Sequence, residues 1–219
     1  MPALYFARHG QSTWNAEGRW QGQADPPLSA LGRAQAARLA ERLAGAGIAL
    51  LAASDLARAR ETAEIVGARL GLAPRLDPAL REHDVGAWSG LRHEEIAARW
   101  PDELARFLAG DLALRPGGGE SRLALRARAR AAAARWRAEA GGRPLLLVSH
   151  LGVLHALAPG ADAPPGALVR VERVRVEAGA AAARGVLAAP HAAVVPDRLA
   201  PARARAVRAA GPRASRSSS

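Results

Sequence analysis

The stretch Ala3-Leu4-Tyr5-Phe6-Ala7-Arg8-His9-Gly10 decides how the amino-terminal part of this chain folds. Its first five residues are rich in strand formers, which predicts a strand that ends in the tripeptide Arg-His-Gly. The stretch Leu145-Leu146-Leu147-Val148-Ser149-His150 repeats this pattern far away along the chain. Open α/β sheets hold their ligands at the carboxyl ends of the strands. We therefore expect His9 and His150 to meet at one sheet edge, with Arg8 beside them, in a pocket for a phosphate.

Strand and helix patterns alternate along the rest of the chain. Two more strands are predicted over 48–53 and 167–177, and the stretch 73–90 is predicted to be irregular. One helix is expected to begin after Ser29 and to stop before Gly45, and the other candidate helices cover 55–70, 92–99, 101–108, 121–140 and 151–157. Strands that alternate with helices indicate a layered α/β domain.

The length of 219 residues suits one domain with an extension. We expect the domain to cover 1–177. The segment 178–219 is rich in Ala, Pro, Arg and Ser, with seven arginines and one acid, Asp197, so we expect a largely disordered basic extension. A basic tail can bind nucleic acid. This one has no aromatic residue to stack on bases, which argues against nucleic-acid binding.

The composition narrows the setting in which the protein works. Cysteine is absent, which excludes disulfides and cysteine-bound metal. The sequence has no run of about eighteen apolar residues and no signal-peptide pattern, so we expect a cytoplasmic protein without a membrane partner. The formal net charge is +11 and all 31 basic residues are arginine. This usage is more typical of the base composition of a genome than of selection for binding to one partner. The oligomeric state stays open, with a homodimer as one option.

The chemistry of phosphate monoesters explains why these residue types belong together. The ester dianion has to be neutralised, attacked in line, and protonated at its leaving oxygen. Arginine suits the first task because its planar fork grips two oxygens, and Arg8 and Arg58 are the candidates. Neutral imidazole suits the second task, and nearby arginines lower its pKa and keep it neutral. A carboxyl group suits the third when burial raises its pKa towards neutrality.

A series of short motifs follows the Arg-His-Gly tripeptide. They are Gln11–Asn15; Gly22, Asp25, Leu28-Ser29, Gly32 and Gln35-Ala36; residues 54–63; Leu80-Arg81-Glu82 with Gly86, Trp88 and Gly90; Pro116 with Gly118–Ser121; and Val148-Ser149-His150. This ordered series resembles the histidine phosphatase superfamily, also called the phosphoglycerate mutase-like family, over residues 3 to 153. The resemblance implies a three-layer α/β/α sandwich with a mostly parallel central sheet.

The resemblance also implies a function and a set of roles. It implies a phosphomonoester hydrolase that acts on a small phosphorylated metabolite, without a metal or other cofactor. His9 resembles the nucleophile that becomes phosphohistidine, and Glu82 resembles the proton donor, which then activates water. The phosphate-binding cluster corresponds to Arg8, Arg58 and His150. The positions that match substrate contacts are Asn15, Gln21, Gly22 and Leu151.

Two positions leave these roles open. His83 and Asp84 adjoin Glu82 and are alternatives to its carboxyl group. The family commonly has glycine directly after its second histidine, whereas here Leu151 stands there and Gly152 follows. We expect the leucine side chain to crowd the phosphate edge of the pocket. The histidines outside every motif, which we expect to be structural or surface residues, are His93, His155 and His191.

Two other functions compete with hydrolysis. A cofactor-dependent phosphoglycerate mutase has the same scaffold, but mutases of this family add a lysine and paired arginines after the acid block. This chain has no lysine, and its segment 92–115 is short. A non-catalytic polyanion-binding protein would use the basic extension. The presence together of His9, Arg58, Glu82 and His150 argues against that function, so hydrolysis is favoured.

Overall fold

A computed structural model describes residues 3–171 and 193–194 of the chain. In this structure six strands form one sheet in the order β3-β2-β4-β1-β5-β6. They are β1 (Leu4–Arg8), β2 (Leu50–Ala53), β3 (Arg75–Leu76), β4 (Leu145–Ser149), β5 (Leu168–Val171) and β6 (Ala193–Val194). Four strands run parallel to one another, namely β3, β2, β4 and β1. β5 pairs antiparallel with β1, and β6 pairs antiparallel with β5. The prediction of a mostly parallel sheet is confirmed.

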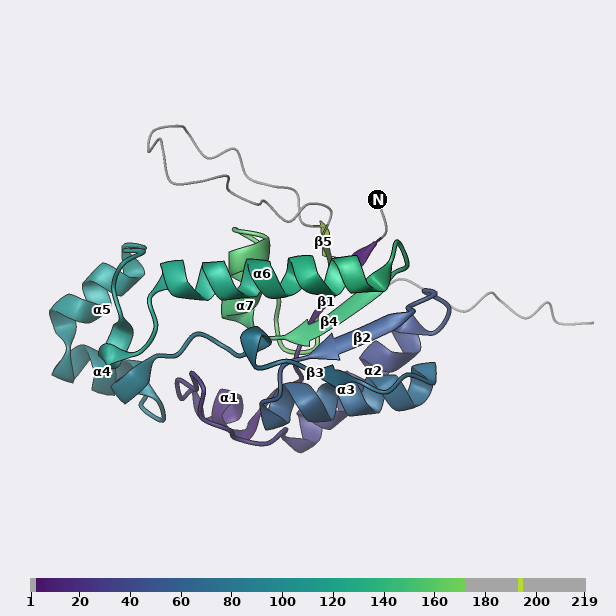
Figure 1. The fold of residues 1–219 in the computed structure, drawn as a ribbon. Coiled ribbons are helices and arrows are strands. Elements are labelled where there is room, and N and C mark those ends of the chain that lie inside the picture. Colours follow the sequence, from purple (N-terminus) through teal and green to yellow (C-terminus); the bar gives the residue numbers. More distant parts are fainter. Residues whose placement is uncertain (1–2, 172–192, 195–219) are drawn as a thin grey trace, which may run out of the picture.

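Helices cover both faces of this sheet, so the molecule has three layers (Figure 1). α2 (Ala30–Leu43) and α3 (Ala57–Leu70) pack on one face, and α6 (Arg122–Ala140) and α7 (Leu151–Leu157) pack on the other. The shorter helices α1 (Thr13–Glu17), α4 (His93–Arg99) and α5 (Pro101–Leu108) lie towards the end to which the parallel strands point. This arrangement is the expected three-layer α/β/α sandwich.

The central strands are buried on both faces because successive side chains point to opposite sides of a sheet. In β4, Leu145 and Leu147 belong to the core beneath α6 and α7. Leu146 and Val148 belong to the core beneath α2 and α3. A strand buried on both faces has a nearly continuous apolar sequence, which is why β4 could be recognised from its leucines.

Capping residues place several helix ends where the sequence predicts them. Ser29 Oγ accepts the N–H of Gly32 at 3.0 Å as α2 begins, and Ser121 Oγ accepts the N–H of Ala124 at 3.2 Å as α6 begins. α3 ends at Gly71, whose φ of 69° is a left-handed conformation that glycine adopts without strain.

The stretch 73–90 is more ordered than the sequence predicts. It contains β3 and two 3-10 turns, η1 (Pro78–Leu80) and η2 (Gly86–Trp88), and a third turn, η3 (Pro116–Gly118), lies in the later glycine loop. Asp77 holds this stretch in place. Its carboxylate accepts the N–H of Ala79 at 2.9 Å and the indole N–H of Trp136 at 2.7 Å. Because Trp136 lies far along the chain, no local pattern reveals this anchor.

The C-terminal part of the chain is described only in part. Of the strand predicted over 167–177, the structure describes Leu168–Val171, and the rest lies outside the described residues. Within the predicted extension 178–219, the described residues Ala193–Val194 pair with β5. The domain boundary and the predicted disorder of the extension therefore stay predictions. None of the helices in the described ranges is long and apolar enough to cross a membrane.

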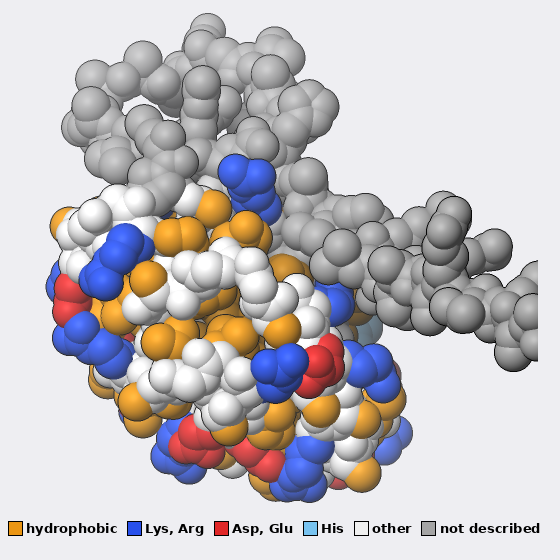
Figure 2. Space-filling model, turned by 90° about the vertical axis from the view of Figure 1, so that its right-hand side faces the viewer, with side chains coloured by type: hydrophobic (Ala, Val, Ile, Leu, Met, Phe, Trp, Pro, Cys, Tyr) orange, Lys and Arg blue, Asp and Glu red, His pale blue; other side chains and the backbone are white. Residues whose placement is uncertain are grey.

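The described residues form no basic patch on the face of the molecule where the parallel strands begin. Figure 2 shows blue and red side chains interspersed around the rim of this face, with hydrophobic and uncharged atoms in the middle. Ion pairs account for part of this pattern. At the C-terminal end of α3, Arg69 pairs with Glu41, and at the start of β3, Arg75 pairs with Glu139.

The loop after β1 packs backbone to backbone on α2. A Cβ at Gly32 would lie 2.0 Å from the carbonyl oxygen of Gln11, and a Cβ at Gly10 would lie 2.3 Å from that of Gly32. Because backbone atoms cause both clashes, no side-chain rotation relieves them. These two glycines therefore set how closely the loop after β1 approaches the helix.

We predict that Gly32→Ala lowers the free energy of unfolding by about 1–3 kcal/mol, the usual cost of overpacking a close-packed contact. Denaturation by urea measures this change. Leu31→Ala is the control, because Leu31 is exposed on the same helix and surface substitutions change stability by about 0.5 kcal/mol or less. Equal stability of the two variants would contradict the prediction.

Candidate active site

Three neighbouring strands deliver side chains to the carboxyl edge of the sheet. His9 follows β1, His150 follows β4 and Ser54 follows β2, and these strands are adjacent in the order β2-β4-β1. Arg8 is in register with Ser149, whose carbonyl accepts the N–H of His9 at 2.9 Å. The ring centroids of His9 and His150 consequently lie 5.0 Å apart. The structure brings the two histidines together as the sequence predicts.

His9 is buried and held in one orientation. Its Nδ1 lies 2.6 Å from the carbonyl oxygen of Gly10. A carbonyl can only accept, so Nδ1 carries the proton and Nε2 keeps its lone pair. Burial, and after it the charges of Arg58 and Arg8, lower the pKa of His9 well below its usual value of 6.5. The ring is therefore a neutral imidazole with a free nitrogen at physiological pH.

Arg58 is a fully buried cation from α3. Its terminal nitrogens donate to the carbonyl oxygens of Ala24 at 2.8 Å and Gly22 at 2.9 Å, whereas its Nε has no hydrogen-bond partner. Burial lowers the pKa of Arg58 to about 10, so the side chain stays charged at neutral pH. Gly22 has a φ of 50°, and a Cβ there would lie 2.8 Å from Val85. The loop therefore requires glycine to bring its carbonyl onto Arg58.

Arg8 places a second cation at the same edge. One terminal nitrogen donates to the carbonyl oxygen of Ala163 at 2.8 Å, and the buried Nε has no partner. Burial lowers the pKa of Arg8, and the charges of Glu82 and Asp162 oppose that effect. Arg8 and Arg58 are close enough that the charge of Arg8 also lowers the pKa of Arg58, after the larger effect of burial.

His150 is fully buried beside His9. Its Nε2 lies 2.9 Å from the hydroxyl oxygen of Ser54, which also accepts the N–H of Leu56 at 3.3 Å. The hydroxyl proton is thus available to Nε2, which assigns the ring proton to Nδ1. Burial, and after it the charge of Arg58, lower the pKa of His150 well below 6.5. Nδ1 has no hydrogen-bond partner.

Three buried donors of this cluster are therefore unpaired: Arg8 Nε, Arg58 Nε and His150 Nδ1. They are three of the five buried side-chain nitrogens or oxygens without a partner in the described part of the chain. Leaving such a donor unpaired costs about 1–3 kcal/mol. An anion with several oxygens accepts hydrogen bonds from more than one donor, so the cluster suits a phosphate.

Glu82 provides the carboxyl group of the site. Its Oε1 accepts the N–H of His83 at 2.8 Å and that of Gly152 at 3.0 Å. A Cβ at Gly152 would lie 2.3 Å from this oxygen, so glycine makes room for the carboxylate. The charge of Glu82 is the largest influence that opposes the effect of burial on the pKa of both Arg8 and Arg58. The carboxylate therefore lies within electrostatic reach of both cations.

The two alternatives to Glu82 make other contacts, although His83 also lines the cavity. Asp84 accepts the N–H of Gly86 at 2.9 Å and stabilises the turn that leads into η2. The Nε2 of His83 lies 2.7 Å from the carbonyl oxygen of Glu120, and its ring stacks on Phe107 with the centroids 6.0 Å apart. Among the described residues, Glu82 is the acid that lines the cavity.

Arg128 of α6 holds the loop that carries Glu82. Its guanidinium donates to three backbone carbonyl oxygens of this loop, those of Ala79 at 3.0 Å, Arg81 at 2.6 Å and Glu82 at 2.8 Å. It also pairs with Glu120 through two hydrogen bonds of 2.7 Å. Sequence reasoning missed this residue, because Arg128 is one of many arginines on an Ala/Arg helix.

Asn15 and Gln21 reach the cavity from α1 and the loop after it. Their side-chain oxygens lie 3.1 Å and 2.7 Å from the hydroxyl of Ser12, which also caps α1. Neither amide nitrogen has a hydrogen-bond partner among the described residues. With their oxygens turned to Ser12, both amide groups are available as donors to a bound anion.

These side chains line one cavity of about 480 Å³. Of the predicted site residues, those that line it are Arg8, His9, Asn15, Gln21, Gly22, Arg58, Glu82 and Leu151. His150 is not among the lining residues and lies fully buried next to His9. Leu151 stands half-buried at the cavity wall, so a leucine does occupy the edge where the family commonly has glycine.

The cavity extends beyond the residues that the sequence predicts. Its further lining includes Arg19, Trp20, Phe107, Arg122 and His155. Trp20 and Phe107 meet edge to face, with ring centroids 5.4 Å apart, in a small apolar cluster next to α4 and α5. His155 is exposed, as expected, but it lies at the cavity. None of these residues belongs to a motif, so the sequence alone offered no signal for them.

The assembled groups meet the requirements of phosphoryl transfer. The site has a neutral imidazole with a free nitrogen, two cations that each have a buried unpaired donor, and one carboxyl group. These groups can respectively attack, bind and protonate a phosphate monoester. The described residues contain no group of three or more His, Cys, Asp or Glu side chains that could hold a metal ion.

The family model of the histidine phosphatase superfamily, branch 1, matches residues 4–176. The chain belongs to this superfamily. Its predicted fold and the resemblance of its motifs are thereby confirmed.

Relatives of this histidine phosphatase include enzymes with different names. A glucosyl-3-phosphoglycerate phosphatase of Mycobacterium tuberculosis is 43% identical over 162 residues, which cover 70% of this chain and 72% of the relative. A probable phosphoglycerate mutase of an Enterobacter species is 42% identical over 152 residues, which cover 68% of this chain and 70% of the relative.

Solved structures give the same family. The structure of a mycobacterial glucosyl-3-phosphoglycerate phosphatase with VO3 has a TM-score of 0.71 at 37% identity, and the match covers 78% of this chain and 90% of that one. An alpha-ribazole phosphatase of Shigella flexneri has a TM-score of 0.68 at 27% identity, with 77% and 89% covered. Sequence and structure together support a phosphatase over the mutase alternative.

His9 and His150 make the stability of the protein depend on pH. Both are neutral when folded, whereas histidine in the unfolded chain binds a proton below about pH 6.5. The unfolded state then binds more protons, so the free energy of unfolding falls as the pH drops below about 6.5. We predict a slope of up to about 1.4 kcal/mol per pH unit for each histidine between pH 6.5 and 5.

Urea denaturation at pH 7, 6 and 5 measures this slope. His9→Gln should reduce it by the share of one histidine. His93→Gln is the control, because His93 is exposed at the start of α4. A slope that His9→Gln leaves as steep as in the parent protein would show that His9 is not held neutral.

Proposed function

We propose that this histidine phosphatase hydrolyses phosphate monoesters of small metabolites through a phosphohistidine on His9. One observation carries the proposal: the neutral ring of His9 lies near the fully buried guanidinium of Arg58 and the partly buried guanidinium of Arg8, and both have a buried, unpaired Nε. A phosphate group bound there would satisfy those donors and present its phosphorus to the free nitrogen of His9.

In the first step the His9 Nε2 attacks phosphorus, in line with the bond to the ester oxygen. A nitrogen–phosphorus bond forms, the phosphorus–ester oxygen bond breaks, and the leaving oxygen takes the proton of the Glu82 carboxyl group. Arg8 and Arg58 stabilise the negative charge on the transferred group. Nδ1 of His150 is proposed to add a third donor to the same oxygens.

In the second step a water molecule attacks the phosphorus of the phosphohistidine. The carboxylate of Glu82 accepts the proton of that water, which restores the acid for the next cycle. The nitrogen–phosphorus bond breaks, inorganic phosphate is formed, and His9 returns to its neutral state. Glu82 thus acts first as an acid and then as a base, and no further reactant is needed.

We assign substrate contacts to three other residues and a supporting role to Gly22. The amide groups of Asn15 and Gln21 are proposed to donate to the phosphate, because their nitrogens are unpaired and line the cavity. Leu151 is proposed to contact the substrate from the cavity wall. Gly22 acts through its backbone, since its carbonyl oxygen holds Arg58.

The substrate class follows from the cavity and from the relatives. A volume of about 480 Å³ is within the usual range for small-molecule sites. The mycobacterial relatives are named for glucosyl-3-phosphoglycerate, a phosphorylated sugar acid. We infer a phosphorylated, sugar-sized metabolite as the substrate here. Reaction in the cytoplasm and a homodimer stay predictions from the sequence.

We predict that the purified protein releases p-nitrophenol from p-nitrophenyl phosphate without added metal, and that EDTA leaves the rate unchanged. His9→Ala should abolish this activity, because it removes the proposed nucleophile that forms the covalent intermediate. His93→Ala, an exposed histidine outside the cavity, is the control and should keep the parent rate. Activity retained in His9→Ala would exclude His9 as the nucleophile.

A second pair of variants tests the acid. We predict that Glu82→Gln lowers kcat by roughly a hundredfold or more and changes KM little, because a proton donor acts mainly in the transition state. The amide still accepts the two backbone N–H groups that hold the side chain. Asp84→Asn is the matched control and should keep kcat, since Asp84 serves a turn. The reverse outcome would assign the acid to Asp84.

A further inference from the structure

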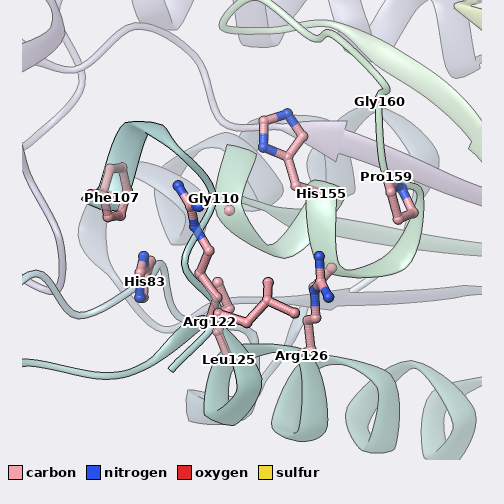
Figure 3. A pocket seen from close by; sticks show the side chains of 12 residues that line it. His83, Phe107, Gly110, Arg122, Leu125, Arg126, His155, Pro159 and Gly160 are labelled. Carbon is pink, nitrogen blue, oxygen red and sulfur yellow. The ribbon is translucent and has the colours of Figure 1, made fainter. Parts of the chain in front are cut away.

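A second cavity of about 310 Å³ adjoins the candidate active site (Figure 3). We call it the annex. The two cavities share five lining residues, which are His83, Phe107, Arg122, Gly152 and His155. Because these side chains border both spaces, a molecule that lies with its phosphate at His9 can extend its other end into the annex.

Two arginines of α6 enter the annex. Figure 3 shows Arg122 and Arg126 rising from the same side of the helix, with Arg122 towards Phe107 and His155 across the cavity from both. The guanidinium carbon of Arg122 lies 4.0 Å from the ring centroid of Phe107, which fixes its orientation. Neither guanidinium has a hydrogen bond or an ion pair with another described residue.

This pair of like charges is not balanced by the protein. Residues four apart on a helix are neighbours, and like charges there are destabilising. Burial, and after it the charge of Arg126, lower the pKa of Arg122. Asp111 opposes that effect, but its carboxylate pairs with Arg106 at 2.8 Å. Elsewhere on the helices, residues at this spacing also form pairs of opposite charge, as in Arg60 with Glu64 and Arg99 with Glu95.

We propose that Arg122 and Arg126 bind a second anionic group, a carboxylate or a phosphate, on the leaving-group part of the substrate. A guanidinium fork matches the oxygens of either group. The remaining wall of the annex is largely apolar, with Leu112, Leu125 and Pro159, and suits the carbon skeleton that joins the two anions. The inference rests on the proposed function and narrows its substrates to phosphate esters with an anionic leaving group.

Two pairs of substrates test the annex. 3-Phosphoglycerate and glycerol 3-phosphate differ in a carboxylate, and fructose 1,6-bisphosphate and fructose 6-phosphate differ in a second phosphate. Arg122→Gln/Arg126→Gln should lower kcat/KM roughly tenfold or more for the anionic member of one pair, through the loss of charge-assisted hydrogen bonds. The neutral member should change by less than about twofold. The pair that responds identifies the anion.

Equal changes within both pairs, or no change in either, would overturn the inference. Arg38→Gln/Arg60→Gln is the matched control for the double variant, because it removes the same two charges from exposed positions on α2 and α3. If this control reproduced the selective loss, the effect would come from net charge and the annex would have no part in it. If the double variant also loses p-nitrophenyl phosphate turnover, the single variant Arg126→Gln replaces it in the same comparison. Arg126 lines the annex and not the active-site cavity.

The two proposals fail in different ways. If the parent protein hydrolyses neither these esters nor p-nitrophenyl phosphate, both the proposed function and the proposed anion site in the annex are wrong. If the parent protein hydrolyses p-nitrophenyl phosphate and the arginine variants show no preference between paired substrates, the annex alone is wrong.

Discussion

The constraint on which the site depends is the placing of two guanidinium groups at one edge of the sheet, with Arg58 fully buried and Arg8 partly buried. A buried charge without a partner is costly, so the protein must surround each cation with acceptors. It uses mainly backbone carbonyls, those of Ala24 and Gly22 for Arg58 and that of Ala163 for Arg8. Carbonyls are dipoles and carry no net charge, so they hold the cations without cancelling them. Burial, and after it the remaining positive field, keep His9 neutral, and the unpaired Nε atoms remain as donors for an anion.

Loop paths around the site follow from this constraint. The segment after α1 must bring two carbonyls onto Arg58, and Gly22 makes that approach possible. On the other side, Gly152 leaves room for the carboxylate of Glu82, whose oxygen would be 2.3 Å from a Cβ. The departure at Leu151 is thus explained in part: the glycine that faces Glu82 is present one position later, and Leu151 packs against the core beneath α6 and α7.

Sequence reasoning succeeded where local pattern and position agree. Arg8, His9 and His150 end or follow apolar strands, so strand prediction alone placed them at one edge. Arg58 and Glu82 could be assigned only through the family resemblance, because a helical arginine and a loop glutamate carry no local signal. Asp77 shows the limit, since its contact with Trp136 joins residues far apart. The annex was missed for a similar reason, as α6 carries six arginines and its sequence does not show which ones face a cavity.

The exposure of the residues around the cavity also helps to distinguish hydrolysis of a phosphohistidine from transfer of its phosphate to another substrate group. A mutase has to keep water away from its phosphohistidine, whereas a phosphatase needs water as the second reactant. Gly18 and His155, which are far apart in the sequence, are both exposed and both line this cavity. Water therefore has access to the space beside His9. Cations at Arg122 and Arg126 would hold an anionic leaving group only until the ester bond breaks, after which the alcohol and the phosphate are separate molecules that can leave by the same opening.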